Sequence, residues 1–429
     1  MTDSTSAIDL ILAPFHQFGV NLGLERIHTL LAALGSPHHA VPIVHVAGTN
    51  GKGSVCAYLS SVFSAAGYKV GRYTSPHLVD WNERICIDDR PIATDVAVKA
   101  IEQAIAAIDP TRPIPTQFEI VTAAMWLYFA QSQVDIAVIE VGLGGRLDAT
   151  NVCDRPLATA ITSIALEHWQ QLGDTIAKIT WEKAGILKPD CPAIVGTLPP
   201  EAVAVVTERI ATLNCPTTWV KPAVATRQPE SLGGVSSIPI ALPWVESDGI
   251  SYPLSLVGEV QLTNSAIAIA TIQVLRQAGW QISDAAIASG MANTRWLGRL
   301  QWTMWQGSKL LIDGAHNAAA ASALRQYVDT LQRPISWVIG MLSTKAHREI
   351  LQALLRPGDR LTLVPVPGHS SADLAMLADL ARSVCPALGI ASCDDLPLGL
   401  AAASATTDTH QLVLCGSLYL LGEFLKLDC

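Results

Sequence analysis

The sequence predicts an α/β protein with two domains, each built on a doubly wound and mostly parallel sheet. Three observations lead to this prediction. The chain has 429 residues, which is too long for one ordinary core. Half of its residues are hydrophobic and only 15% are charged, enough apolar material to cover a sheet on both faces. From about residue 40 onward, short β-rich runs alternate with helical patterns.

The strands and helices of the first domain follow from the periodicity of the chain. The β-rich runs expected as parallel strands are PIVHVAG, KVGRYTS, DIAVIEVG, ATAITSI and PAIVGT. After the first run, apolar residues recur at helical spacing at Val55, Tyr58, Leu59, Val62 and Phe63, so segment 48–54 is expected between a strand and a helix. Another helix is predicted over TNSAIAIATIQVLRQAG. Residues 221–257, rich in proline and glycine, predict a loop or small hairpin insertion.

The second domain repeats the alternation of strands and helices. We place the boundary near residue 295, so that the domains comprise residues 1–295 and 296–429. The β-rich runs are KLLIDGAHN, ISWVIGML, RLTLVPVP, IASCDDL and HQLVLCGS, each followed by helical sequence, which predicts a smaller Rossmann-like unit. Trp296, Trp302 and Trp305 are interpreted as aromatic residues that pack domains.

Composition excludes several classes of function. The net charge is -9 and no run of Lys and Arg is present, which argues against a nucleic-acid partner. The nine cysteines include no CxxC pair and indicate a reduced interior without a zinc site. The N-terminus has no basic n-region, and no apolar stretch reaches the roughly 18 residues of a membrane span. We therefore expect a cytoplasmic protein with no membrane partner.

The segment Gly48–Ser54, GTNGKGS, is close to a phosphate-binding loop, although Gly53 separates Lys52 from Ser54. Its three glycines let backbone N–H groups approach an anion, and the following helix contributes its positive end. Lys52 adds charge. This pattern predicts a P-loop-type ATPase domain that binds ATP phosphates, and the alternative is a tight glycine turn with a solvated lysine.

Further polar residues follow apolar runs. Glu140 ends a strand in a position suited to Mg²⁺, and its alternative is a strand-end residue on the surface. Taken alone, His168 is more typical of a structural hydrogen-bonding group, and Lys183 of a cation on a helix surface. The second domain carries a polar cluster of Asp313, His316 and Asn317, for which a helix N-cap turn is the alternative.

Seven segments together resemble one known family: HVAGTNGKGS, TSPHL, NERI, EVGLGGRLDATN, EKAGILKP, LIDGAHN and CGSLYLLGE. They are similar, from about residue 19 to the C-terminus, to the folylpolyglutamate synthases and dihydrofolate synthases of folate biosynthesis, relatives of the Mur ligases. The resemblance implies that the γ-phosphate of ATP passes to a carboxylate, and that the amino group of L-glutamate attacks the acyl phosphate. The acceptor would be dihydropteroate or the γ-carboxylate of tetrahydrofolate.

The resemblance also implies site residues. ATP would contact Gly51, Lys52, Gly53, Ser54, Asn264, Arg299 and Asp313, with His316 nearby. Mg²⁺ would be bound by Ser75, Glu140, His168 and Lys183. Lys183 matches a lysine that is carbamylated in family members, which turns a cation into an oxygen ligand. Lys52, Lys183 and His316 are the expected catalytic residues.

The pterin substrate would contact three segments. They comprise Val20, Asn21 and Leu22, then Thr116, Gln117, Phe118 and Glu119, and then Leu147, Asp148 and Ala149. Asn21 stands where bacterial dihydrofolate synthases often carry Asp, and it lacks the charge to pair with a polarised pterin. Val260 replaces a histidine common in the family, and Ala346 follows Lys345 where an Asp is usual.

Several functions remain open at this point. We expect a monomeric ligase that takes ATP, L-glutamate and either dihydropteroate or reduced folate, with polyglutamylation alone as its alternative. A Mur-type ligase acting on a peptidoglycan precursor would leave TSPHL and RLDATN unexplained. A regulatory nucleotide-binding protein without ligase activity would not need Ser75, Glu140, His168 and Lys183 together.

Overall fold

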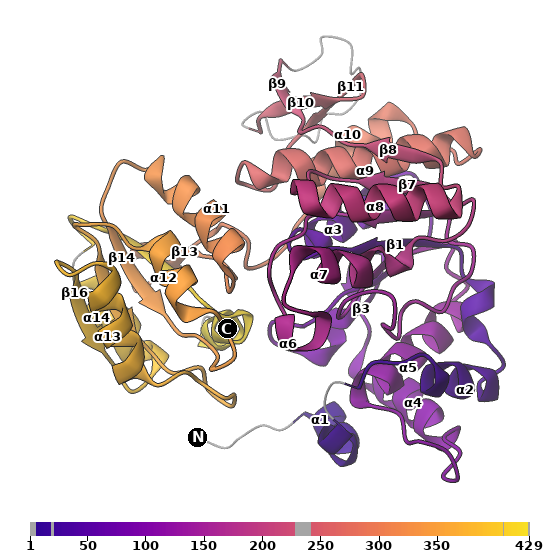
Figure 1. Cartoon of the computed structure of the whole chain (residues 1–429), viewed down its shortest axis with the longest axis horizontal. Helices are drawn as coiled ribbons and strands as arrows, with labels where there is room; N and C mark the ends of the chain where they lie inside the picture. Colours follow the sequence, from indigo (N-terminus) through magenta and orange to yellow (C-terminus); the bar gives the residue numbers. More distant parts are fainter. Residues whose placement is uncertain (1–5, 19–20, 228–241, 406, 428–429) are drawn as a thin grey trace. The chain divides into compact units, whose positions relative to one another are not determined.

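The computed structural model describes residues 6–18, 21–227, 242–405 and 407–427. The chain forms two compact units, the first comprising Met1–Ser255 with Gln261–Arg295 and the second Leu256–Val260 with Trp296–Cys429 (Figure 1). Among the described helices, none combines the length and apolar character needed to cross a membrane.

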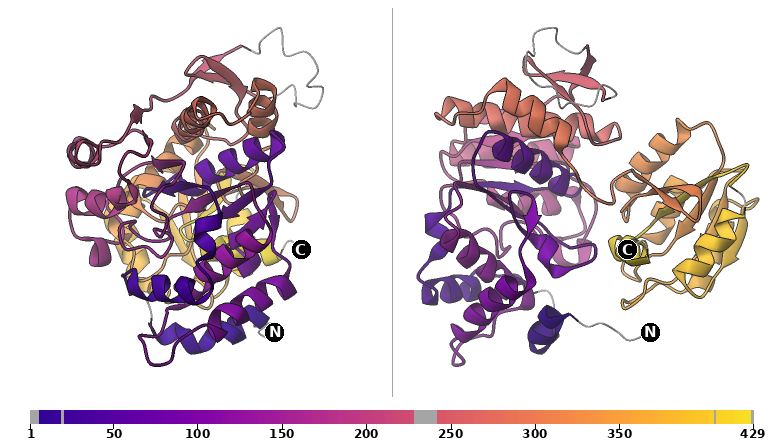
Figure 2. Two further views of the ribbon diagram at one scale, coloured as in Figure 1. Left: turned by 90° about the vertical axis from the view of Figure 1, so that its right-hand side faces the viewer. Right: turned by 180° about the vertical axis from the view of Figure 1, so that it is seen from behind.

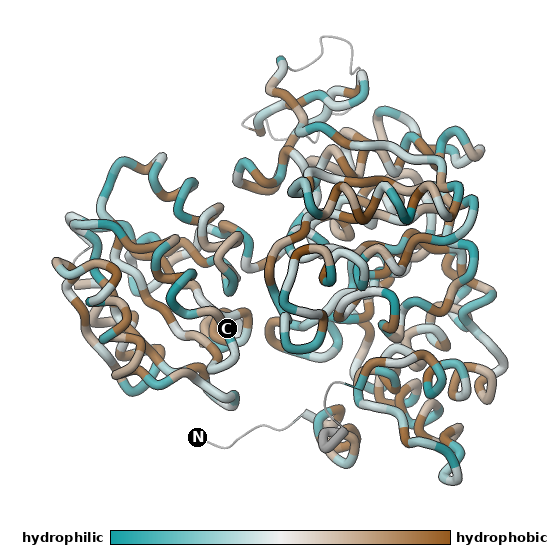
Figure 3. Tube along the Cα trace, in the orientation of Figure 1, coloured by the Kyte–Doolittle hydropathy of each residue, from teal (hydrophilic) through white to brown (hydrophobic). Residues whose placement is uncertain are grey.

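The first unit contains a sheet in the order β4-β3-β2-β5-β1-β6-β7-β8. Its parallel strands are β1 (Ile43–Ala47), β2 (Val70–Tyr73), β5 (Ile136–Glu140), β6 (Ala158–Ile161), β7 (Ala193–Val195) and β8 (Thr217–Trp219). Two short antiparallel strands, β3 (Ile85–Ile87) and β4 (Arg90–Pro91), extend the β2 edge. The predicted mostly parallel sheet is confirmed. Its central strands β1 and β5 are buried along their whole length. Figure 3 colours each residue of the chain by its hydropathy.

Helices cover both faces of this sheet because alternate residues of each strand point to opposite sides. One face carries α1 (Ala7–Leu12), α2 (Glu25–Ala33), α4 (Thr94–Ala106), α5 (Gln117–Gln131), α7 (Ile176–Lys183) and α8 (Pro200–Leu213). The opposite face carries α3 (Lys52–Ala65), α9 (Val260–Gln277) and α10 (Asp284–Asn293). Short helical turns are η1 (Ala13–Phe18), η2 (Pro37–Ala40), η3 (Trp81–Arg84), α6 (Trp169–Leu172) and η4 (Ala184–Ile186).

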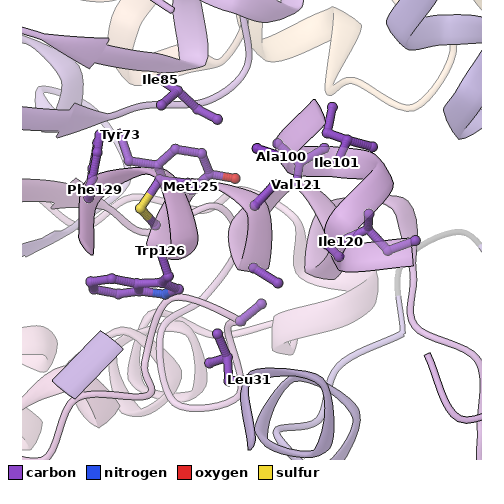
Figure 4. Close-up of a cluster of buried hydrophobic side chains, with 14 of the residues drawn as sticks. Leu31, Tyr73, Ile85, Ala100, Ile101, Ile120, Val121, Met125, Trp126 and Phe129 are labelled. Atoms are coloured by element: carbon purple, nitrogen blue, oxygen red, sulfur yellow. The ribbon is translucent and has the colours of Figure 1, made fainter. Parts of the chain in front are cut away.

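A core of buried apolar side chains lies under α5 in the first unit. Met125, Trp126 and Phe129 of α5 are fully buried, and they pack near Tyr73 at the end of β2 (Figure 4). A side chain on Gly71 would run into the Phe129 ring, so the helix lies directly on the strand. This packing holds the N-terminal end of α5 next to the strand ends, where the candidate site lies.

The insertion predicted within residues 221–257 forms a small antiparallel sheet. It comprises β9 (Val224–Thr226), β10 (Trp244–Ser247) and β11 (Ile250–Pro253), in the order β11-β10-β9. The predicted hairpin is present as β10 and β11, and β9 adds a strand that was not predicted. Residues 228–241 of the insertion lie outside the described residues.

The second unit, coloured orange to yellow in Figure 2, has the sheet order β12-β13-β17-β14-β15-β16. Strands β13 (Ser308–Ile312), β14 (Ile335–Ile339), β15 (Arg360–Leu363), β16 (Gly389–Ser392) and β17 (Gln411–Cys415) are parallel, as predicted. One face packs against α11 (Ala318–Asp329), α12 (His347–Leu354) and α13 (Leu374–Val384). The remaining helices are α14 (Leu396–Ser404), which packs on β14 and β15, and α15 (Leu418–Leu427), which packs on β17.

One strand of the second unit was not predicted. β12 (Gln301–Trp305) pairs antiparallel with β13 and contains two of the tryptophans interpreted as domain-packing residues. The Trp305 ring lies 6.0 Å from the Phe424 ring, and Trp302 donates a hydrogen bond to the Tyr327 hydroxyl (2.9 Å). Both tryptophans therefore contribute to packing within the second unit.

Candidate active site

The glycine-rich segment 48–54 connects β1 to α3. Because α3 begins at Lys52, residues Lys52, Gly53 and Ser54 form the first helical turn and not the loop before it. Gly51 has φ of +89°, a region that favours glycine. A Cβ on Gly51 would collide with the side-chain oxygen Oδ1 of Asn264. The first N–H groups of α3 have no helical partner, so the turn is built to approach an anion.

Hydroxyl side chains at the end of β6 hold this turn. Thr162 Oγ1 and Ser163 Oγ both donate to the Asn50 carbonyl oxygen, at 2.7 and 3.0 Å. The Asn50 N–H donates to Ser163 Oγ (3.1 Å), and the Thr49 N–H donates to the Ser163 carbonyl oxygen (2.7 Å). Thr162 and Ser163 were not predicted from the sequence to belong to the site. Their signal was the position of two hydroxyl residues after an apolar strand.

A cation, a carboxylate and a serine meet beside the turn. Lys52 Nζ lies 3.7 Å from Glu140 Oε1 and donates to the Thr49 carbonyl oxygen (3.1 Å). The Ser75 N–H donates to Glu140 Oε2 (3.3 Å). Glu140 is only 5% exposed and the Lys52 side chain 16%. Neither the surface alternative for Glu140 nor the solvated-lysine alternative for Lys52 fits these values.

Lys183 is buried at the end of α7 and reaches the same turn. It is 4% exposed, and its Nζ donates to the Gly48 carbonyl oxygen (2.8 Å). Burial, followed by the positive charge of Lys52, lowers the pKa of Lys183 to about 7. The alternative of a cation on a helix surface is therefore wrong. A largely buried amine beside a phosphate-type turn points to a role in the site.

His168 occupies the position before α6. Its backbone is left-handed, with φ of +51°, and its Nε2 lies 3.9 Å from Glu167 Oε1. The His168 side chain is 44% exposed and that of Glu167 9%. Within the described residues, no group of three or more His, Cys, Asp or Glu side chains is placed to hold a metal ion. A metal at this turn would need further ligands, such as phosphate oxygens.

The glycine-rich turn after β5 is held by its own carboxylate. Asp148 accepts hydrogen bonds from the Leu143 N–H (2.7 Å) and from the N–H and hydroxyl of Thr150 (3.0 and 2.5 Å). Burial raises the pKa of Asp148, while these hydrogen bonds oppose the increase. Thr150 Oγ1 also lies 2.9 Å from His45 Nε2 on β1. This network ties the turn to the strand that precedes the glycine loop.

Arg26 links two of the three predicted pterin segments. Thr116 and Glu119 form a capping box at the start of α5, and Arg26 Nε donates to Glu119 Oε2 (3.0 Å). Arg26 Nη2 also donates to the Asn21 carbonyl oxygen. Glu119 is 3% exposed, and its Oε1 is buried without a hydrogen bond from the described residues. Asn21 and Glu119 therefore lie close together.

The third pterin segment contacts the first. The Gly23 N–H donates to the Leu147 carbonyl oxygen (3.3 Å). The Phe118 ring packs against the turn that follows β5. It lies so close to Gly142 that a Cβ there would collide with the ring. Gln117 begins α5 directly after the Thr116 cap, and Ala149 is buried. Leu22 and Leu143 both pack against the apolar cluster that α7 and α8 form on the sheet. Val20 lies outside the described residues.

The second unit has its own polar cluster at the end of β13. Asp313 accepts from the N–H groups of Leu300 (2.8 Å) and Ala315 (2.9 Å), and burial raises the pKa of its carboxyl group. His316 Nδ1 lies 2.7 Å from the Gly314 carbonyl oxygen. Arg299 passes over Gly314, where a Cβ would collide with its guanidinium group. The cluster also contains the N-cap that was considered as an alternative: Asn317 caps α11.

The chain is similar to known proteins along most of its length. Residues 299–427 match the family model described as dihydrofolate synthetase, C-terminal domain. A folylpolyglutamate synthase of Lacticaseibacillus casei is 38% identical over 354 residues, or 80% of this chain and 81% of the relative. A probable dihydrofolate synthetase of Schizosaccharomyces pombe is 33% identical over 424 residues, or 95% and 99%. The solved structure of Mycobacterium tuberculosis folylpolyglutamate synthase complexed with ADP and AMPPCP has a TM-score of 0.85, 29% identity and 98% coverage of both chains.

The buried His45 should make stability depend on pH. Burial lowers its pKa from 6.5 to about 3, so between these values the unfolded chain binds a proton that the folded chain does not. The free energy of unfolding therefore falls as pH falls below 6.5, by up to about 1.4 kcal/mol per pH unit. His45→Asn removes this titration. In urea unfolding at pH 6 and pH 5, the wild type should lose about 1 kcal/mol more than the variant, and equal losses would contradict the neutral His45.

Proposed function

Because the chain belongs to the folylpolyglutamate synthase and dihydrofolate synthase family, we propose that it adds L-glutamate both to dihydropteroate and to a reduced folate. The chain is an ATP-dependent ligase that uses a divalent metal ion. The Mur-type and regulatory alternatives are set aside by this membership. The two acceptors are proposed together because one of the two compared relatives is named for each activity.

The observation that carries the proposal is the meeting of Lys52, Glu140 and Ser75 beside the glycine turn. Mg²⁺ prefers hard oxygen ligands and is commonly held by one or two carboxylates together with substrate phosphates. Glu140, whose carboxylate accepts from the Ser75 N–H, offers oxygen ligands of this kind, and Lys52, 3.7 Å from that carboxylate, offers positive charge for the phosphates. When bound, Mg²⁺ would neutralise phosphate charge during transfer. We assign Ser75 and Glu140 to the metal, and Lys52 with Gly51–Ser54 to the phosphates.

Lys183 and His168 are proposed to complete the metal site. An ammonium group repels a metal ion, whereas a carbamate offers oxygen ligands, so the metal role of Lys183 requires carbamylation. Support for the proposal comes from its burial and from the 2.8 Å contact with Gly48, which place the side chain at the turn. His168 follows a strand end near Glu167 and would add a neutral nitrogen ligand.

Reaction chemistry assigns the remaining roles. The acceptor carboxylate attacks the γ-phosphorus of ATP while ADP leaves, which gives an acyl phosphate. The amine of L-glutamate then attacks the carbonyl carbon of the acyl phosphate and loses a proton while phosphate leaves. Positive charge from Lys52 and the N–H groups of the α3 turn would stabilise the anions of both steps. Asn264, Arg299 and Asp313 are proposed as nucleotide contacts. His316, which interacts electrostatically with Asp313, is proposed as a catalytic residue.

The acceptor is proposed to lie against Asn21, Leu22, Thr116–Glu119 and Leu147–Ala149. Contacts among these segments, made through Arg26 and Gly23, support a common binding surface. The buried Oε1 of Glu119 could accept an N–H of the pterin ring. Val20 is also proposed to contact the acceptor.

We also propose that the protein is a cytoplasmic monomer. Its substrate ATP is abundant in the cytoplasm, and the eight cysteines of the described residues are free thiols, as in a reducing compartment. Both points remain predictions.

Lys52→Ala should weaken nucleotide binding, because a charge-assisted contact to phosphate is lost. The expected increase in the dissociation constant for ADP is about 10- to 100-fold by isothermal titration calorimetry. The matched control is Lys99→Ala, since Lys99 is exposed on α4 and pairs with Asp95. Unchanged ADP affinity in Lys52→Ala would refute the phosphate assignment.

Lys183→Ala should abolish turnover while ADP binding survives within about threefold, because its carbamate would serve the metal and not the nucleotide itself. Removal of CO₂ should lower the turnover of the wild type, and bicarbonate should restore it. Turnover is measured as phosphate release. Normal turnover of the variant would rule out the carbamate role.

The acceptor proposal is tested by phosphate release from Mg-ATP and L-glutamate with either dihydropteroate or tetrahydrofolate, followed by the product mass. We expect release with both acceptors and a mass gain of one glutamyl group. Asn21→Asp should raise turnover with dihydropteroate, because it adds charge opposite the pterin. Release with tetrahydrofolate alone would limit the activity to polyglutamylation, and release with neither would contradict the proposal.

A further inference from the structure

Gln261 joins two parts of the candidate nucleotide site. It lies in the first turn of α9 and is 2% exposed. Its Nε2 donates to Ser54 Oγ at 3.4 Å, and its Oε1 accepts from Asn264 Nδ2 at 3.1 Å. In this helix, Asn264 was predicted as an ATP contact and Val260 was noted as a departure from the family, whereas Gln261 was not predicted to have a role. A single buried amide thus contacts both a residue of the glycine motif and a predicted nucleotide contact.

The contacts extend to the last glycine before α3. Asn264 Oδ1 lies so close to Gly51 that a Cβ there would collide with it. Ser54 is 2% exposed and Asn264 8%. An unbroken series of buried contacts therefore runs from Gly51 through Asn264 and Gln261 to Ser54. It bridges the turn and the first turn of α3, the two parts that must keep a fixed geometry around a phosphate group.

The direction of the hydrogen bonds determines what Ser54 can do. Asn264 donates to Gln261, and Gln261 donates to Ser54 Oγ. A hydroxyl group has one proton and two acceptor positions. Because Gln261 occupies one acceptor position, the hydroxyl proton and the second acceptor position stay available to a phosphate oxygen or its metal ion. A carboxylate at residue 261 would instead draw the Ser54 proton toward itself.

We propose that Gln261 is a positioning residue for the nucleotide, which orients the Ser54 hydroxyl and the Asn264 amide. The inference rests on the proposed function of Gly51–Ser54 in binding ATP phosphates. Gln261 acts through its two neighbours and need not touch the nucleotide. A buried amide that served packing alone would affect stability, whereas a positioning residue also affects nucleotide affinity, and the two roles are separable by experiment.

The test compares ADP affinity in the presence of Mg²⁺ among full-length variants. Gln261→Met keeps the length of the side chain and removes both hydrogen bonds, so the dissociation constant should rise about tenfold. Gln261→Glu keeps an acceptor for Asn264 but loses the donor to Ser54 and adds negative charge, so its loss should be larger. The dissociation constant for the folate acceptor should stay within twofold in both variants.

Two controls separate positioning from a general effect on α9. Thr271→Val removes a buried hydroxyl of the same helix that bonds only the Ile267 carbonyl oxygen among the described contacts, and it should leave ADP affinity unchanged. In a cycle of Ser54→Ala, Gln261→Met and the double variant, the losses in affinity should be less than multiplicative, because Gln261 acts partly through Ser54.

The outcomes distinguish this inference from the proposed function. A wild type that binds no ADP would refute the phosphate site itself. If the wild type binds ADP, Lys52→Ala weakens binding and either Gln261 variant that folds binds within twofold of the wild type, the positioning role is refuted alone. Losses of affinity that multiply in the cycle would also overturn it.

Discussion

The candidate site depends on one close contact, between the turn that follows β1 and the end of β6. Thr162 and Ser163 donate to the same carbonyl oxygen, that of Asn50, and a Cβ on Gly48 would collide with the Thr162 hydroxyl. β1 and β6 are adjacent parallel strands, so the sheet itself brings the two segments together. The turn is therefore held before any ligand arrives, which spares binding the entropy of ordering it.

Two lysines and one carboxylate are largely buried together around this turn. Lys52 and Lys183 are held near Glu140, and burial of an unpaired ion would cost several kcal/mol. In the low-dielectric interior, the charges interact more strongly than they would in water. The positive charge of Lys52 beside the α3 turn therefore acts strongly on a polyanionic substrate. Stability and function draw on the same few side chains here.

Sequence patterns predicted the elements that depend on local periodicity. Most of the parallel strands were recognised because a strand that is covered on both faces reads as a short apolar run. The helix α3 was recognised because Val55, Leu59 and Val62 recur at helical spacing. The parallel strand β8, only half-buried, was missed. The strand β12 was missed because QWTMW mixes exposed and half-buried residues and reads as an exit from the first domain.

The site was predictable only in part, for a related reason. The glycine motif and Glu140 are local signals that depend on a strand end. The burial of Lys183 could not be read from α7, since a lysine at a helix end is usually solvated, and its contact with Gly48 spans 135 residues of sequence. Thr162, Ser163 and Gln261 were missed because their partners also lie far along the chain. Only the pairing of strands and helices reveals such contacts.

In the proposed acceptor site, the loop that carries Asn21 is held by main-chain contacts, whereas the side chain of Asn21 is left to contact the substrate. Arg26 contacts the main-chain carbonyl of Asn21, and Gly23 contacts the main-chain carbonyl of Leu147, so the loop is held without the side chain of residue 21. An Asn or an Asp at this position can therefore sit on the same backbone. The difference between them is confined to one charge and one hydrogen-bond donor. Acceptor preference can then change by substitution at this position while the ATP-binding turn, which is held by β6, keeps its geometry.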